Sequence, residues 1–187
     1  SSDLEPLRME LKKLQAHNVC VIDDGSLIRP NGSWSFHSYG DCFKTYHRER
    51  AGISYSEMAY RGRLESGEGC LVTRKVMTAG KGLWMIVNDI WCEGNHTVRE
   101  YYHLDPGVEA KAAGMEMVLT NGTVQLKALG EQQVHGPQTE PVSVPFHLEE
   151  CKVSLEYNRF SESMCLVKEG NFADSFISNS VFCGADV

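Results

Sequence analysis

The first fifteen residues carry a helical pattern of hydrophobic positions. Leucines stand at positions 4, 7, 11 and 14, so they share one face of a helix. Lys12 and Lys13 lie near the end of this pattern, where positive charge favours the C-terminus of a helix. The pattern predicts one short amphipathic helix at the start of the chain.

From Val19 onward, short apolar or alternating runs are separated by turn residues, a pattern typical of β-strands. Asn121-Gly122 is the strongest hairpin signal, because this pair favours the tight turns that join antiparallel strands. The polar segment 130–142 is predicted to be one long surface loop. The predicted strands span residues 18–22, 43–49, 53–60, 69–77, 82–90, 97–104, 108–112, 115–119, 123–129, 142–147, 151–157, 162–168 and 174–182.

Many short strands with no helix between them are typical of a sandwich of two sheets. The pattern therefore predicts an all-β fold, namely an antiparallel β-sandwich of the supersandwich type with a short N-terminal helix. A chain of 187 residues is long enough for one domain with its own core. We therefore expect residues 1–187 to form a single β-sandwich domain.

The segment from His96 to Gly107 shows clear strand alternation. Two alternating faces are predicted. One carries Val98, Glu100, Tyr102 and Leu104, and the other carries Thr97, Arg99, Tyr101 and His103. His96 and His103 are seven residues apart, so a regular strand points them to opposite faces. A simple metal pair is therefore excluded, and both are predicted to be structural histidines.

Charge and hydropathy narrow the class of partner. The formal net charge is -7 and the pI is about 5.5, which argues against general binding to nucleic acid or to a membrane surface. No apolar run approaches the ~20 residues that a membrane span needs. We therefore expect neither nucleic acid nor membrane among the partners.

The cysteines are widely spaced and form no CxxC pair, which gives a zinc finger or a thioredoxin-like motif little support. They are predicted to be small buried hydrophobic residues of a reduced protein. Asn-x-Ser/Thr triplets begin at Asn31, Asn95 and Asn121 and are interpreted as turn chemistry. The seven cysteines stand at positions 20, 42, 70, 92, 151, 165 and 183.

The segment 44–63 is the most basic part of the chain. Arg48 and Arg50 share a predicted strand face, and guanidinium groups suit carboxylate or sulfate groups. The alternative is a solvated face with weak ion pairs, which the nearby Glu49 and Glu57 favour. The aromatic side chains that could stack on sugar rings are Trp34, Tyr39 and Tyr46.

Several motifs occur in an order that resembles a known family. They are AHN at 16–18 with a following DG, TRKV at 73–76, LWMIVND at 83–89, HTV at 96–98 and YHLDPG at 102–107. This order resembles the carboxy-terminal β-sandwich of the heparinase II/III-like polysaccharide lyases, which include related alginate lyases. The resemblance runs from about Arg8 to Leu104 and is weaker over 150–183, where SLEYN at 154–158 resembles a late strand. Asn88 departs from the aliphatic residue that many relatives carry.

The resemblance implies a fragment of a larger enzyme. In the family an upstream α/α toroid and the sandwich enclose an acidic polysaccharide, which is cleaved by β-elimination at a uronate. A neutralising group polarises the carboxylate, a base removes the C5 proton and an acid protonates the leaving oxygen. The toroid carries the catalytic asparagine, histidine and tyrosine, so the resemblance implies no catalytic residue in this chain, whose partners are the toroid and the polysaccharide.

The resemblance also implies one metal ligand, His17, because the histidine of the AHN motif helps to bind zinc in the family. The other family ligands, a histidine and an aspartate, lie upstream of that motif. The sixteen residues before His17 contain no histidine. A zinc site needs three or four ligands, so this chain alone is not expected to bind zinc tightly. The alternative for His17 is a hydrogen bond to backbone, and Asn18 is expected to close a turn or pair with backbone groups.

Two classes of function follow. The first is the sandwich domain of a heparinase II/III-like lyase for uronate-containing polysaccharide, with Arg48, Arg50 and Trp34 as candidate substrate contacts and His17 as a candidate zinc ligand. The alternative is a non-catalytic carbohydrate-binding or scaffolding module. The chain contains no GxSxG or HExxH motif, so an independent hydrolase is not expected.

Overall fold

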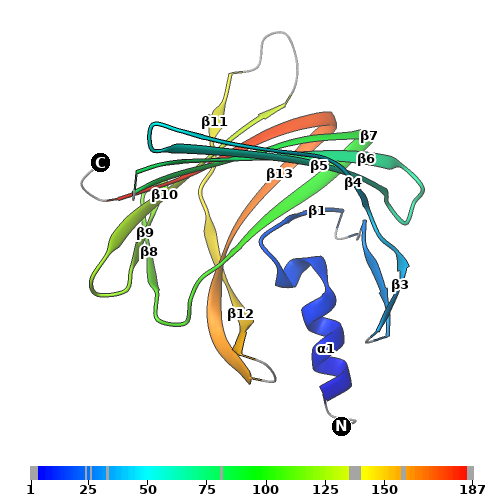
Figure 1. Cartoon of the computed structure of the whole chain (residues 1–187), viewed down its shortest axis with the longest axis horizontal. Coiled ribbons are helices and arrows are strands. Elements are labelled where there is room, and N and C mark those ends of the chain that lie inside the picture. Colours follow the sequence, from blue (N-terminus) through cyan, green and yellow to red (C-terminus); the bar gives the residue numbers. More distant parts are fainter. Residues whose placement is uncertain are drawn as a thin grey trace.

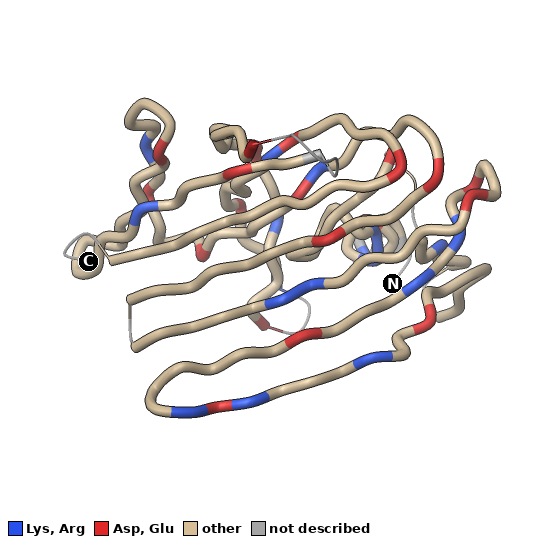
Figure 2. The backbone as a smooth tube through the Cα atoms, turned by 90° about the horizontal axis from the view of Figure 1, so that it is seen from above, with Lys and Arg blue, Asp and Glu red and all other residues tan. Residues whose placement is uncertain are grey.

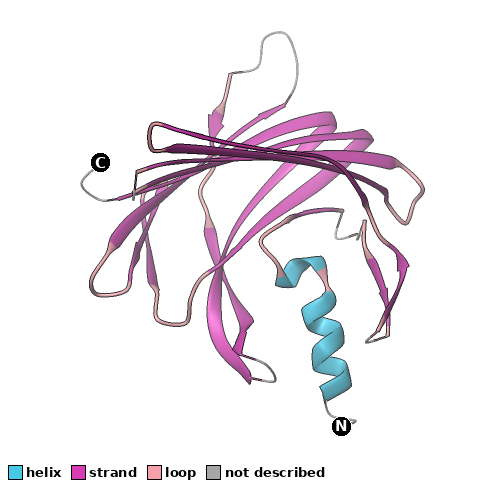
Figure 3. Cartoon of the chain, viewed as in Figure 1, coloured by secondary structure: helices cyan, strands magenta, loops and turns pink. Residues whose placement is uncertain are grey.

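The computed structural model describes residues 4–23, 25, 27–32, 34–80, 82–134, 140–156 and 159–184. It confirms the predicted all-β sandwich with a short N-terminal helix (Figure 1, Figure 3). The elements are α1 (Leu4–Lys12), the 3-10 helix η1 (Leu14–Ala16), β1 (Cys20–Ile22), β2 (Arg29–Asn31), β3 (Ser35–Ser38), β4 (Asp41–Arg50), β5 (Ile53–Arg63), β6 (Gly69–Ala79), β7 (Leu83–His103), β8 (Glu109–Ala113), β9 (Glu116–Thr120), β10 (Gln125–Val134), β11 (Val142–Ser143), β12 (His147–Glu156) and β13 (Arg159–Gly184).

The strands form one antiparallel path in the order β4-β5-β6-β7-β13-β10-β9-β8, with β1, β11 and β12 paired beside it. The first half of β7 pairs with β6, and its second half pairs with β1. The first half of β13 pairs with β12, and its second half pairs with β10. Two long strands therefore belong to both layers of the sandwich, and Figure 1 shows them bending from one layer into the other.

The bend of β7 and β13 is a β-bulge. Gly94 has φ 108 and Asp174 has φ 60, and the carboxylate of Asp174 accepts a 2.8 Å hydrogen bond from the Gly94 N–H. The register shifts between Ala173 and Ser175 at the same place. The sequence prediction of separate strands on either side of a turn was wrong here, because a bulge bends a strand without ending its pairing.

The N-terminal helix and the Asn121-Gly122 hairpin are confirmed. Gly122 has φ 84, and Asn121 Oδ1 accepts hydrogen bonds from the N–H groups of Thr123 and Val124 at 3.1 and 2.9 Å. The surface loop predicted over 130–142 was wrong for its first part, because β10 continues to Val134. Residues 135–139 of that prediction lie outside the described residues.

The β2–β3 hairpin was not predicted, because its short strands are mostly exposed and show no apolar alternation. It packs against α1 through cationic side chains. Lys12 Nζ donates a 2.9 Å hydrogen bond to the Gly32 carbonyl and lies 4.4 Å from the centre of the Phe36 ring. In the described part of the chain no helix is long and apolar enough to cross a membrane.

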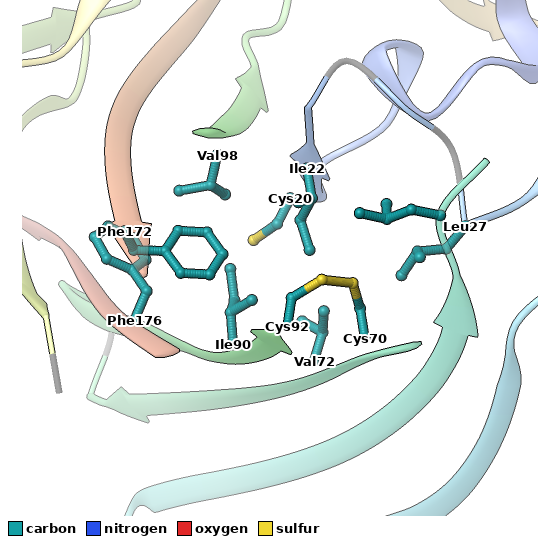
Figure 4. Close-up of a cluster of buried hydrophobic side chains, with 11 residues drawn as sticks. Cys20, Ile22, Leu27, Cys70, Val72, Ile90, Cys92, Val98, Phe172 and Phe176 are labelled. Atoms are coloured by element: carbon teal, nitrogen blue, oxygen red, sulfur yellow. A yellow bond between two sulfur atoms is a disulfide. The ribbon is translucent and has the colours of Figure 1, made fainter. Parts of the chain in front are cut away.

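The largest buried cluster lies between the layers and contains a disulfide (Figure 4). Cys70 and Cys92 stand directly opposite each other on β6 and β7, with Cα atoms 4.4 Å apart, and are bonded. The prediction that all cysteines are reduced was therefore wrong for this pair. The remaining cysteines are free thiols: Cys20, Cys42, Cys151, Cys165 and Cys183. The rest of the cluster comprises Cys20, Ile22, Leu27, Leu64, Val72, Ile90, Val98, Phe172 and Phe176.

A buried ion pair joins the two long strands. Glu100 and Lys168 are register partners, both side chains are 0% exposed, and Lys168 Nζ lies 3.7 Å from Glu100 Oε1. Glu100 Oε2 accepts hydrogen bonds from Asn88 Nδ2 at 2.7 Å and from the Tyr102 hydroxyl at 3.0 Å. Asn88, the departure from the family pattern, therefore has a role, because it satisfies a buried carboxylate.

The predicted alternation of residues 97–103 is also confirmed. Val98, Glu100 and Tyr102 face the interior between the layers and are buried. Tyr101, on the opposite face, packs with Leu14 of η1 in a separate cluster. The second half of β7 is thus covered on both faces.

Candidate binding groove

A hollow of about 990 Å³ lies where β4, β5, β6 and β7 meet the β2–β3 hairpin. The disulfide forms part of its wall, and the bulge of β7 and β13 contributes a carboxylate, Asp174. We call this hollow the groove. Its lining residues are Leu27, Arg29, Ser38, Tyr39, Asp41, Arg61, Gly62, Arg63, Gly69, Cys70, Leu71, Trp91, Cys92, Glu93 and Asp174.

The sheet register sets the order of side chains along one wall of the groove. Arg61 pairs with Leu71 across β5 and β6, and Leu71 pairs with Trp91 across β6 and β7. These three residues therefore point to the same side of the sheet. Trp91 is 50% exposed, and Tyr39, which also lines the groove, is 79% exposed.

The charged side chains in the groove balance in number, and hydrogen bonds hold the three arginines. Asp41 Oδ2 accepts from Arg61 Nε at 3.2 Å and from Arg61 Nη2 at 3.0 Å. Arg29 Nε donates to Ser38 Oγ at 2.9 Å, and Arg63 Nη1 donates to the Gly67 carbonyl at 2.9 Å. The three arginines are Arg29, Arg61 and Arg63, and the three carboxylates are Asp41, Glu93 and Asp174.

The predicted substrate contacts Arg48, Arg50 and Trp34 do not come together. Arg48 and Arg50 share the outer face of β4, opposite Tyr55 and Ile53 of β5, and are exposed. Because each residue of an extended strand adds roughly 3.3 Å, Arg48 and Arg50 lie roughly 20–30 Å along β4 from Asp41, at the groove end of the strand. Trp34 lies in the β2–β3 turn, 83% exposed, with the guanidinium of Arg8 4.2 Å from its ring.

His17, the predicted zinc ligand, is exposed at the end of η1 and shares a small hollow with His103. In the described part of the chain, the side chains that could hold a metal together do not include His17. They are His147, Glu149 and Glu169, and the guanidinium of Arg99 already pairs with both glutamates. The described residues therefore do not fit a zinc site at His17.

Asn18 pairs with backbone, as predicted. Its Oδ1 accepts a 2.8 Å hydrogen bond from the His103 N–H and lies 3.0 Å from His103 Nδ1. Its carbonyl accepts a hydrogen bond from Arg74 Nη1. Burial lowers the pKa of His103, and the nearby His17 lowers it further. Asn18 thus anchors the segment before β1 to β6 and β7.

His96 is a satisfied structural histidine, as predicted. Its Nδ1 lies 2.6 Å from Asp23 Oδ2, and its Nε2 lies 2.9 Å from the Glu93 carbonyl. Burial opposes the charged imidazolium, but the hydrogen bonds outweigh burial and the pKa of His96 is raised. Burial likewise opposes the Asp23 carboxylate, but hydrogen bonds from His96 and Thr97 lower its pKa.

This pair makes stability depend on pH. Because the pKa of His96 is raised in the folded state, this histidine stabilises the fold at pH values below its ordinary pKa of 6.5. The stabilisation is lost as the pH rises through the raised pKa. Because the pKa of Asp23 is lowered in the folded state, this aspartate stabilises the fold at pH values above its ordinary pKa of 3.8. The stabilisation is lost as the pH falls through the lowered pKa. We expect the difference in unfolding free energy between the native protein and His96→Gln to be largest between these two values.

Urea unfolding at a series of pH values measures this difference. His103→Gln is the matched control, because the pKa of His103 is lowered and not raised. The contribution of His103 to the unfolding free energy should therefore increase as the pH rises toward the ordinary pKa of 6.5. A difference for His96→Gln that does not change with pH would contradict the prediction.

The molecule is thus an all-β sandwich with an open groove at one end, and solved structures with this fold exist. A structure of heparinase III superimposes with a TM-score of 0.65 at 10% identity, covering 96% of this chain and 25% of that chain. Heparan sulfate lyase HepC from Pedobacter heparinus gives 0.62 at 12% identity, with coverage of 97% and 26%. The heparinase III BT4657 gene product gives a TM-score of 0.62 at 11% identity, covering 93% of this chain and 24% of that chain. Neither a protein-family model nor a curated protein matches by sequence.

The chain therefore has the fold of a domain of these lyases and spans about a quarter of their length. The predicted resemblance is confirmed at the level of the fold, which is what proteins at this identity share.

Proposed function

We propose that this chain is the β-sandwich domain of a lyase of the heparinase II/III type that cleaves a uronate-containing polysaccharide by β-elimination. The observation that carries the proposal is the likeness to heparinase III over 96% of the chain. The ordered motifs between Arg8 and Leu104 support it independently, because they are a property of the sequence alone.

In this proposal the catalytic asparagine, histidine and tyrosine belong to an upstream toroid domain, and the sandwich forms one wall of the substrate cleft. His17 would be a zinc ligand only in a longer protein that supplies the other donors. Arg48 and Arg50 are proposed to bind carboxylates or sulfates, because two exposed guanidinium groups on one strand face match acidic groups repeated along a chain. Trp34, beside α1, would contact a different part of the polysaccharide.

The test compares the complete product of the gene with this chain alone on heparan sulfate, hyaluronan and alginate. β-Elimination creates a C4–C5 double bond conjugated to the carboxylate, so ultraviolet absorbance reports each cleavage. We expect the complete product to be active and the chain alone to be inactive. An inactive complete product on every acidic polysaccharide, or a gene with no helical repeats upstream, would overturn the proposal.

The arginines provide a sharper variant. Arg48→Ala/Arg50→Ala should weaken binding of the cleaved polysaccharide about tenfold, which corresponds to roughly 1.4 kcal/mol. Binding should also become less sensitive to salt, since fewer charges are paired. Arg159→Ala is the matched control, because Arg159 is exposed on the distant β12–β13 hairpin beside Glu156. Equal effects of both changes would remove Arg48 and Arg50 from the proposed contact surface.

A carbohydrate-binding module without chemistry is the second candidate function. The exposed Trp34 in the β2–β3 turn favours it, since an exposed aromatic ring needs no second domain to meet a sugar. Binding of glycans by the isolated chain, lost in Trp34→Ala, would support this candidate with the site at the β2–β3 turn.

A further inference from the structure

We propose that the groove binds an uncharged sugar residue, stacked on Trp91 and hydrogen-bonded by Asp41 and Arg61. This site is separate from the acidic-polysaccharide contacts proposed at Arg48 and Arg50, at the other end of β4. The inference goes beyond the lyase proposal and does not rest on it, because each residue named belongs to this chain.

The first support is the position of the tryptophan. Trp91 lies on the wall of the groove and is half exposed, although tryptophan is a residue that is highly buried on average. The C–H groups of a pyranose ring form an apolar face, and an aromatic ring is a large apolar surface that such a face can cover. Leu71, beside Trp91 in the register, continues this surface toward β5.

The second support is the polar pair that faces the tryptophan across one strand. Arg61 lies two strand spacings from Trp91, which is roughly 10 Å, with Leu71 between them. Both hydrogen bonds from Arg61 end on Asp41 Oδ2, which leaves Oδ1 outside the ion pair. A sugar hydroxyl both donates and accepts, so adjacent hydroxyls can donate to the carboxylate and accept from the guanidinium.

The third support is the charge balance, which selects the class of sugar. The groove has as many carboxylates as arginines, so it offers little net attraction to a polyanion. Figure 2 shows the same mixture of signs across the sheet, with blue and red positions interspersed along the strands. An acidic sugar would also meet the carboxylates Glu93 and Asp174, whereas an uncharged sugar would not be repelled.

The walls of the groove are also built to hold their shape. The disulfide between Cys70 and Cys92 ties β6 to β7 beneath it, and the Arg29–Ser38 and Arg63–Gly67 hydrogen bonds fix two arginines at its rim. A pocket that is formed before the ligand arrives loses less conformational entropy on binding.

The test is titration calorimetry of the 187-residue chain with cellotetraose, chitotetraose and maltotetraose, and with a heparan sulfate tetrasaccharide for comparison. We expect at least one uncharged tetrasaccharide to bind with an affinity that does not change between low and high salt. Trp91→Ala should weaken this binding at least about tenfold, Trp91→Phe should retain most of it, and Asp41→Asn should weaken it. Leu155→Ala, which removes an exposed apolar side chain of β12 outside the groove, is the control and should leave it unchanged.

Three outcomes would overturn the inference. One is that no uncharged tetrasaccharide binds, and another is that only the heparan sulfate tetrasaccharide binds, with an affinity that falls as salt rises. The third is that Trp34→Ala removes binding while Trp91→Ala does not, which would place the sugar at the β2–β3 turn. Circular dichroism of each variant checks folding, and the lyase assay of the complete gene product fails or succeeds independently of these results.

Discussion

Lys168→Met will destabilise the protein by about 3–5 kcal/mol, the cost typical of breaking a buried ion pair from one side. The change leaves the Glu100 carboxylate fully buried with no cation beside it. Glu100 Oε1 is already without a hydrogen bond among the described residues. The positive charge of Lys168 is therefore what offsets the cost of burying this oxygen. Lys168 also loses its own hydrogen bonds, which it donates to the Asn179 carbonyl at 2.6 Å and to Ser180 Oγ at 2.8 Å.

The double variant Lys168→Met/Glu100→Gln separates the charge from the packing. A neutral amide still offers an oxygen to Asn88 and Tyr102 but needs no counter-charge. We therefore expect the double variant to be more stable than Lys168→Met alone, measured by urea unfolding. Burial lowers the pKa of Lys168, in the direction expected for an ammonium group that is kept charged only by its partner.

Lys152→Met is the matched control for this cycle. Lys152 forms an exposed ion pair with Glu162 at 3.5 Å, and exposed pairs contribute little. The control should therefore change stability by less than about 0.5 kcal/mol. If Lys168→Met were as mild as Lys152→Met, the buried ion pair would not exist in the folded protein.

Loss of the Cys70–Cys92 disulfide will cost about 3 kcal/mol of unfolding free energy, because the bond closes a loop with a sequence separation of 22. The bond restricts the unfolded chain, and this restriction is lost in Cys70→Ala/Cys92→Ala or on reduction. Urea unfolding with and without reductant measures the effect. The reductant should destabilise the native protein and have no effect on the double variant.

Cys42→Ala is the control for the disulfide, since Cys42 is an exposed free thiol and its removal leaves the bond intact. Titration of free thiols in the denatured, unreduced protein gives an independent measurement. Five titratable thiols are expected from the free cysteines, whereas titration of all seven cysteines in the sequence would show that the bond is absent.

Features encoded within a few neighbouring residues could be predicted from the sequence. The leucine spacing predicted α1, the alternation around Glu100 predicted which side chains of β7 share a face, and Asn121-Gly122 predicted the β9–β10 turn. Each depends on a periodicity or a turn preference that acts over short sequence distances. The ordered motifs added the fold of the sandwich, and the hydrogen bonds of His96 and Asn18 agreed with the predictions.

Features that join distant residues were decided only by the tertiary structure. The bulge needs the Gly94–Asp174 hydrogen bond, which spans 80 residues, and the ion pair needs Lys168 opposite Glu100. The disulfide partners and the groove depend on the register of β5, β6 and β7, because pairing places residues side by side that no local pattern connects. Local sequence patterns therefore predicted many of the strand segments and the alternation of faces along β7. Only the packed sheet determined where β7 and β13 continue through the bulge and which charged, aromatic and sulfur-bearing side chains meet.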